Sequence, residues 1–273
     1  NPWDAEATRR AIQRAYGHEQ LELARPCIRS LSDRQFYAQY HYQRAEQTLK
    51  RYVRVHLKSK DFISISLGVD SQEWNRFNIV IRKLGADLTA CVQSLHALPG
   101  VLASAVYYSL QLNKHFVPPK GRYVNHAYVT ECLKKRSELA TVAAQLEATV
   151  QVQGFKHLAA LANQSKHYSI VFPALSADLT GTRKKQYMLV FPEFKSGRSS
   201  FPQALVTDFL PPLHEHLSKS VVLSGHALNT VLQCAVQPII PPDAPPIGGA
   251  PLNSDVSHQE NLHVVNIMFM IGA

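Results

Sequence analysis

The sequence predicts a mainly α-helical protein, a helical bundle with one small β-hairpin inserted near residues 168–192. Three observations support this prediction. Apolar residues recur at helical spacing through several long stretches, whereas strand-like patterns are confined to short runs. Apolar residues make up 45% of the 273 residues and charged residues 18%, which is the composition of a folded chain and not of a disordered one.

The first segment, residues 1–70, is predicted to form helices and a short strand. Residues 4–23 have the pattern of a polar helix, and Pro26 is expected to interrupt the helical pattern after it. Apolar residues then repeat at helical spacing over 34–59, which predicts a long helix that becomes strongly basic towards its end. Residues 62–67 alternate apolar and polar side chains, as a short strand does.

The second segment, residues 71–236, is predicted to be the helical core. A long helix is expected from about residue 73 to residue 112, with a kink or break near Pro99, because proline lacks a backbone donor and clashes with the preceding turn. A second helical stretch, rich in Ala, Leu and Glu, is expected over 127–150.

A short helix over residues 155–163 is expected to come after Gly154. Two β-rich runs come next, at 168–172 and 186–191, on either side of a polar connection. Their spacing and composition predict the hairpin.

The end of the chain divides into two further helices and a tail. Helices are predicted over 202–218 and 222–236, and Pro211 and Pro212 are expected to break or bend the first of them. The third segment, residues 237–273, has the proline-rich composition of a linker and ends in an apolar tail.

The charge balance favours phosphate-rich partners. Lys and Arg number 29 against 20 Asp and Glu, which gives a net charge of +9. In the basic part of helix 34–59, Arg51, Arg54 and Lys58 are predicted to bind RNA phosphates, beside tyrosines that can stack on bases. A solvated charged face explains the same pattern equally well.

Cysteine spacing, histidine spacing and hydropathy argue against metal, cofactor and membrane partners. The four cysteines lie far apart, which indicates neither a zinc site nor a disulfide framework and suits the reducing cytoplasm. His214 and His216 are two residues apart on a predicted helix and so point in different directions. No glycine-rich phosphate loop comes after a strand, and no run approaches the length of about 20 apolar residues that a membrane span needs.

The most informative stretch is the helix end at residues 161–167. Asn163 and His167 are four residues apart and share a helix face, and Lys166 adds positive charge beside them. Such a set can bind a phosphate, and the histidine can transfer a proton during attack of a ribose hydroxyl on phosphorus. The same side chains can instead cap the last carbonyls of the helix.

Residues 88–98 together with 155–167 resemble the pair of core helices in HEPN-type proteins. The motif of that superfamily is an Arg, usually followed by a polar residue such as Asn, and then a His after four to six intervening positions. Asn163 matches the polar residue and His167 the histidine, while Ala162 stands where the family has Arg.

The resemblance implies a helical-bundle fold and an RNA-associated role in a toxin–antitoxin, defence or stress system. It implies either a metal-independent endoribonuclease with an altered motif or a catalytically impaired relative that still binds RNA. His167 would assist proton transfer, Asn163 and Lys166 would hold the phosphate, and His96 on the facing helix would be a second-rank pocket residue. The implied partners are RNA, an antitoxin or other protein, and a second copy of the chain.

Other interpretations of the sequence stay open. The spacing from Arg34 to His41 and from Arg51 to His56 also satisfies the Arg-to-His pattern, as chance predicts in a chain with many of both residues. A non-catalytic interaction module, in which the bundle and hairpin bind a partner protein, explains the missing Arg. A small-molecule sensor with an apolar pocket between helices is a third hypothesis.

Overall fold

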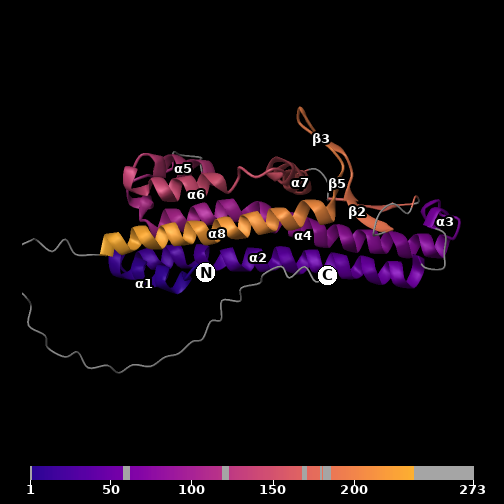
Figure 1. Cartoon of the computed structure of the whole chain (residues 1–273), viewed down its shortest axis with the longest axis horizontal. Coiled ribbons are helices and arrows are strands. Elements are labelled where there is room, and N and C mark those ends of the chain that lie inside the picture. Colours follow the sequence, from indigo (N-terminus) through magenta and orange to yellow (C-terminus); the bar gives the residue numbers. More distant parts are fainter. Residues whose placement is uncertain are drawn as a thin grey trace, which may run out of the picture.

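Three long helices lie side by side along the long axis of the protein (Figure 1). They are α2 (His18–Tyr52), α4 (Ser71–Ser109) and α8 (Val206–Val236). Together with a few short strands they confirm the predicted fold class, mainly α with a small β insertion. The structure is a computed structural model that describes residues 2–57, 62–118, 123–167, 171–178, 180 and 186–236.

Each of these three helices contains proline, and none ends there. α2 continues through Pro26, α4 through Pro99, and α8 through Pro211 and Pro212. The helix breaks expected at these prolines are therefore wrong, and one helix replaces the two predicted over 202–236. A kink at Pro99 and a bend at Pro211 stay predictions. A proline removes a backbone hydrogen bond, but the buried apolar faces of these helices contribute more than that bond costs.

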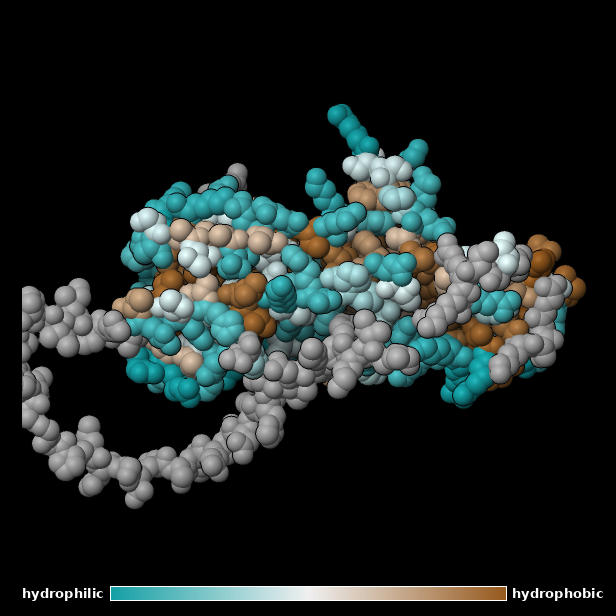
Figure 2. All heavy atoms as spheres, viewed as in Figure 1, coloured by the Kyte–Doolittle hydropathy of each residue, from teal (hydrophilic) through white to brown (hydrophobic). Residues whose placement is uncertain are grey.

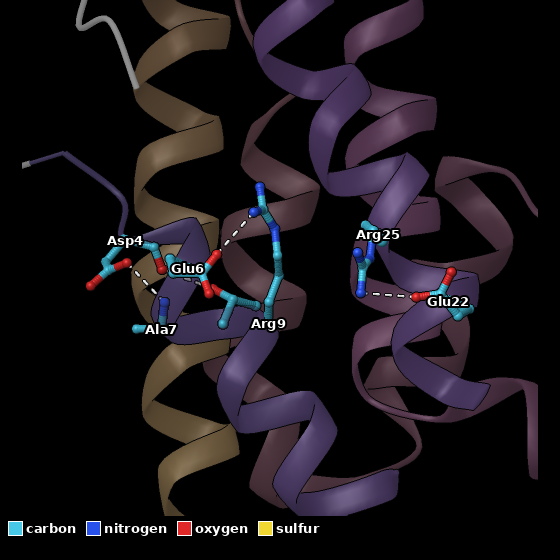
Figure 3. A network of polar contacts seen from close by, with 7 residues as sticks. Asp4, Glu6, Ala7, Arg9, Glu22 and Arg25 are labelled. Atoms are coloured by element: carbon cyan, nitrogen blue, oxygen red, sulfur yellow. Dashed lines mark hydrogen bonds and ion pairs between the residues drawn. The ribbon is translucent and has the colours of Figure 1, made fainter. Parts of the chain in front are cut away.

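Helix α1 (Ala5–Tyr16) precedes α2. The Asp4 carboxylate accepts a hydrogen bond from the backbone N–H of Ala7 at 2.8 Å, which caps the first turn. Gly17, with φ of 85°, lets the chain leave α1 and enter α2, a conformation that glycine adopts at no steric cost. Figure 3 shows the cap and two exposed ion pairs that join residues three apart at 2.9 Å, Glu6 with Arg9 and Glu22 with Arg25.

The N-terminus docks on α8 through Trp3, whose side chain is buried. The indole Nε1 of Trp3 donates to the hydroxyl of Thr8 at 2.8 Å, and the Asn229 side-chain amide donates to the carbonyl of Asp4 at 3.1 Å. Gly225 leaves the space that the indole fills, because a Cβ added there would overlap the ring. One residue on α8 therefore controls how α1 packs.

At the far end of α2 the helix becomes a π-helical turn (Val53–Leu57), and the chain continues into α3 (Phe62–Ser66). The strand predicted over 62–67 is wrong. Ile65 of α3 packs with Tyr52 and Leu57 in a small second core, and the Phe62 ring lies against Tyr187. Alternation over so few residues does not separate a strand from a short helix that tertiary contacts hold in place.

Apolar side chains gather at this end of the bundle (Figure 2). Leu67 and Val69, which come after α3, are 74% and 76% exposed, and Ile63 is about half exposed. Clusters of exposed apolar residues are common at interaction surfaces. This cluster, Ile63, Leu67 and Val69, is called the apolar tip below.

The helix predicted over 127–150 is two helices, α5 (His126–Lys134) and α6 (Ala140–Ala148), so the prediction of one helix is wrong. Arg136 has extended backbone, and a 3-10 turn (Ser137–Leu139) leads into α6. The Lys134 ammonium meets the Glu147 carboxylate at 2.8 Å and joins the two helices. Helix propensity over this stretch is high, but it does not show where a chain reverses.

The predicted hairpin is confirmed as the pair β1 (Ala174–Ala177) and β2 (Tyr187–Phe191), which are antiparallel. The first strand begins later than expected: residues 171–172 are not in a strand, and 168–170 lie outside the described residues. β5 (Ala204–Leu205) pairs with the other edge of β2, in the order β1-β2-β5. A separate hairpin comes after β2, formed by β3 (Phe194–Ser196) and β4 (Ser199–Phe201).

The main hydrophobic core contains side chains from both of the first two predicted segments, including Ile12, Leu31, Leu88 and Leu217. Helix α4 passes through it. Among the described residues α4 is the one helix long and apolar enough to cross a membrane by length and composition, with an 18-residue window of mean hydropathy 1.3. That window is 56% buried within the protein, which is the environment of a core helix. The predicted linker and tail, residues 237–273, lie outside the described residues.

Candidate functional site

Helix α7 (Phe155–His167) carries the stretch that the sequence singled out. The helix predicted over 155–163 is confirmed and extends four residues further. Leu158, Leu161 and Ala162 are buried against the core, and Ala162 is fully buried. The position where HEPN-type proteins have Arg therefore points inwards in this chain, and a guanidinium there would lack both solvent and space.

The last two turns of α7 present the predicted polar residues to solvent. Asn163, Lys166 and His167 are all exposed. The Ser165 hydroxyl, between them, accepts a hydrogen bond from the Gln93 side-chain amide of α4 at 3.1 Å and donates to the carbonyl of Ala162 at 2.8 Å. This contact anchors the end of α7 to α4. The three exposed side chains, Asn163, Lys166 and His167, are called the α7 site below.

Helix α7 crosses α4 steeply. Phe155, in its first turn, stacks on His96 of α4 with ring centroids 6.2 Å apart, while Ser165 in its last turn contacts Gln93. These contacts are ten residues apart on α7, about 15 Å of helix, but only three residues apart on α4. The first and the last turn of α7 therefore both contact one short length of α4.

His96 belongs to this neighbourhood. Burial lowers the pKa of His96, and the positive charge of Lys166 lowers it further. A histidine with a lowered pKa is neutral at physiological pH and can accept a proton or a hydrogen bond. The structure thus brings His96 near Lys166, as the resemblance implied, although His96 is stacked and half-buried while the α7 site is exposed.

The predicted RNA-binding residues lie elsewhere. Arg51 and Arg54 are exposed at the end of α2 and in the π-helical turn, and Lys58 lies outside the described residues. The neighbouring His56 contacts Glu73, which precedes Gln93 on α4 by 20 residues, roughly 30 Å of helix. The structure does not bring these basic residues and the α7 site together, and their role in RNA binding stays a prediction.

The histidines of the two alternative Arg-to-His patterns, His41 and His56, contact carboxylates of α4. Each carboxylate is buried, and an arginine contacts it from the other side. The pairs are Asp87 with His41 (3.0 Å) and Arg44 (3.4 Å), and Glu73 with His56 (3.2 Å) and Arg76 (2.5 Å). Buried charges require such partners, so His41 joins α2 to α4, and His56 joins the π-helical turn to α4.

His214 and His216 contact different parts of the protein. The Nε2 atom of His214 lies 3.3 Å from the carbonyl of Gln35, and that of His216 lies 3.2 Å from the carbonyl of Ala148. Across the described ranges, no three His, Cys, Asp or Glu side chains converge as metal ligands would. The prediction that no metal binds stays untested.

A strip of exposed aromatic rings lies on α2. Phe36 and Tyr40 are two of the positions that repeat at helical spacing in the predicted helix 34–59. They are 50% and 45% exposed, and their rings stack with centroids 6.1 Å apart. Tyr37 beside them is also exposed. Phe36, Tyr37 and Tyr40 are at positions that share one helix face, and their spacing does not tell whether that face is buried or exposed.

The structure also contains a cavity whose position the sequence did not predict. It has a volume of about 740 Å³ and lies between the end of α2, the π-helical turn, β2 and the first residues of α8. No protein-family model, curated protein or solved structure matches the chain. The chemistry of the protein is therefore inferred from the positions and environments of its residues.

Proposed function

We propose that this chain is an RNA-directed, HEPN-like protein whose α7 site binds the ribose–phosphate backbone. One observation carries the proposal: Asn163, Lys166 and His167 are exposed together on the last two turns of α7, which Gln93 anchors to α4. An amide, an ammonium and an imidazole supply the donors and the proton-transfer group that a phosphodiester needs.

The cleavage chemistry is set by these groups. The ribose 2′-hydroxyl attacks phosphorus and loses its proton to an imidazole, while the departing 5′-oxygen takes a proton from a second acid. The products are a cyclic phosphate and a 5′-hydroxyl end. His167 serves as one of the two groups, and His167 of a second copy of the chain serves as the other, which makes a homodimer the active form.

The buried Ala162 makes Lys166 the cation of this site. A lysine ammonium attracts phosphate as a point charge, but it lacks the planar fork with which Arg grips two phosphate oxygens. We therefore expect modest cleavage activity, and binding of RNA in a defence, stress or toxin–antitoxin role that a partner protein regulates.

RNA binding is expected to depend on salt, and part of that dependence should come from Lys166. Lys166→Gln is expected to reduce the slope of log affinity against log salt concentration by about one, because one fewer phosphate contact is made. Fluorescence anisotropy of a labelled single-stranded RNA over a salt series measures this slope.

Lys114→Gln is the matched control, since Lys114 is exposed and lies beyond the end of α4, about 20 residues from Gln93. Its slope should equal that of the wild type. Absence of salt-dependent binding by the wild type, or equal slopes for both variants, would refute the proposal. The interaction-module hypothesis would then be favoured, with the apolar tip as its surface.

A further inference from the structure

The cavity beside β2 is partly open to solvent. Its volume is about 740 Å³. Proteins bind small molecules in cavities of about 300 to 1,000 Å³. The size therefore indicates room for a ligand.

The walls of the cavity are mainly aliphatic. They include Leu49, Val53 and Leu57 from α2 and the π-helical turn, Met188 and Leu189 from β2, and Val206 from α8. Aliphatic walls favour a ligand with a hydrocarbon chain. The chain is removed from water there and needs no hydrogen-bond partner. Polar side chains, among them Gln186 and Thr207, also line the cavity.

The cavity reaches the surface at a basic rim. Lys50 and Arg54 line it and are both exposed, and Glu46 also lines it. The Lys50 ammonium lies 3.8 Å from the Glu46 carboxylate, so those two charges largely offset each other. Arg54 has no ion pair with any of the residues that the structure describes, and its charge remains for a ligand.

The backbone at Arg54 is also unusual. Arg54 lies in the π-helical turn, a conformation that is rare and often occurs at functional sites. Val53 and Leu57 of the same turn line the cavity beside it. The turn thus places two apolar side chains at the wall and one guanidinium at the rim.

We propose that this cavity binds a single-chain amphipathic carboxylate, with the hydrocarbon chain between α2 and β2 and the carboxylate paired with Arg54. An arginine fork binds a carboxylate through two parallel hydrogen bonds, which fixes the orientation of the ligand. This binding site is separate from the α7 site and does not depend on RNA binding.

Isothermal titration of the full chain with dodecanoate and with dodecanol tests the proposal. The wild type is expected to bind dodecanoate about tenfold more tightly than dodecanol, because only the carboxylate pairs with Arg54. Arg54→Gln should remove that tenfold preference and leave dodecanol binding unchanged. Arg29→Gln, an exposed arginine on α2 outside the cavity, should behave as the wild type does.

A variant that fills the cavity provides a second test of the proposal. Leu49→Trp should abolish binding of both ligands while far-UV circular dichroism stays that of the wild type, since Leu49 is only partly buried and lines the cavity. No binding of dodecanoate by the wild type would overturn the proposal. Equal binding of dodecanol and dodecanoate, displacement of dodecanoate by single-stranded RNA, or unchanged binding by a folded Leu49→Trp variant would overturn it as well.

Discussion

Gly225→Ala is expected to lower the free energy of unfolding by about 3 kcal/mol, although glycine-to-alanine changes inside helices usually stabilise by up to about 1 kcal/mol. The added Cβ would overlap the indole ring of Trp3, so the ring must leave its buried position on α8. Its hydrogen bond to Thr8 would be lost with it. Urea denaturation followed by circular dichroism measures the change.

Gly100→Ala is the matched control for this prediction. Gly100 lies in α4, and a Cβ there would meet no atom within 4 Å. It should therefore raise stability by about 1 kcal/mol. If both alanine variants were equally stabilising, Trp3 would not be packed against Gly225 as described.

His167→Ala is expected to lower the rate of metal-independent RNA cleavage at least about 100-fold, because it removes the proton-transfer group from both halves of a dimeric site. Asn163→Ala should lower the rate as well, while the protein stays folded, since both side chains are exposed. Cleavage of a labelled single-stranded RNA in EDTA, quantified by gel electrophoresis, gives the rates.

His18→Ala is the control for the catalytic prediction, because the His18 side chain is 70% exposed at the start of α2 and far along the chain from α7. Its rate should match that of the wild type. Cleavage that survives unchanged in His167→Ala would assign the activity to another site or to a contaminant.

The sequence predicted the helical elements well where an apolar face repeats over many turns. Leu84, Leu88, Cys91 and Leu95 recur three or four residues apart and are buried in α4 as expected. The helix breaks expected at Pro99 and Pro211 are wrong, because both residues lie inside continuous helices. The free energy gained by burying the apolar faces of these helices exceeds the cost of one lost backbone hydrogen bond. The local sequence predicts how much a proline destabilises a helix, but it does not predict the stabilisation from tertiary packing that offsets this effect.

The candidate site was predicted in part. Spacing alone placed Asn163 and His167 on one face of a helix, and the structure puts both on the exposed face of α7. The burial of Ala162 and the anchoring of Ser165 by Gln93 could not be predicted, because both depend on how α7 crosses α4. The cavity was missed for the same reason, since its walls come from segments far apart in the chain.

The most direct measurement for the central claim is photo-crosslinking of the full chain to thiouridine-substituted RNA, with the modified peptides identified by mass spectrometry. The proposed function predicts crosslinks within residues 163–167, the exposed end of α7, and their loss when unlabelled RNA competes. RNA that binds the protein but crosslinks only to other segments would contradict the claim that the α7 site contacts RNA.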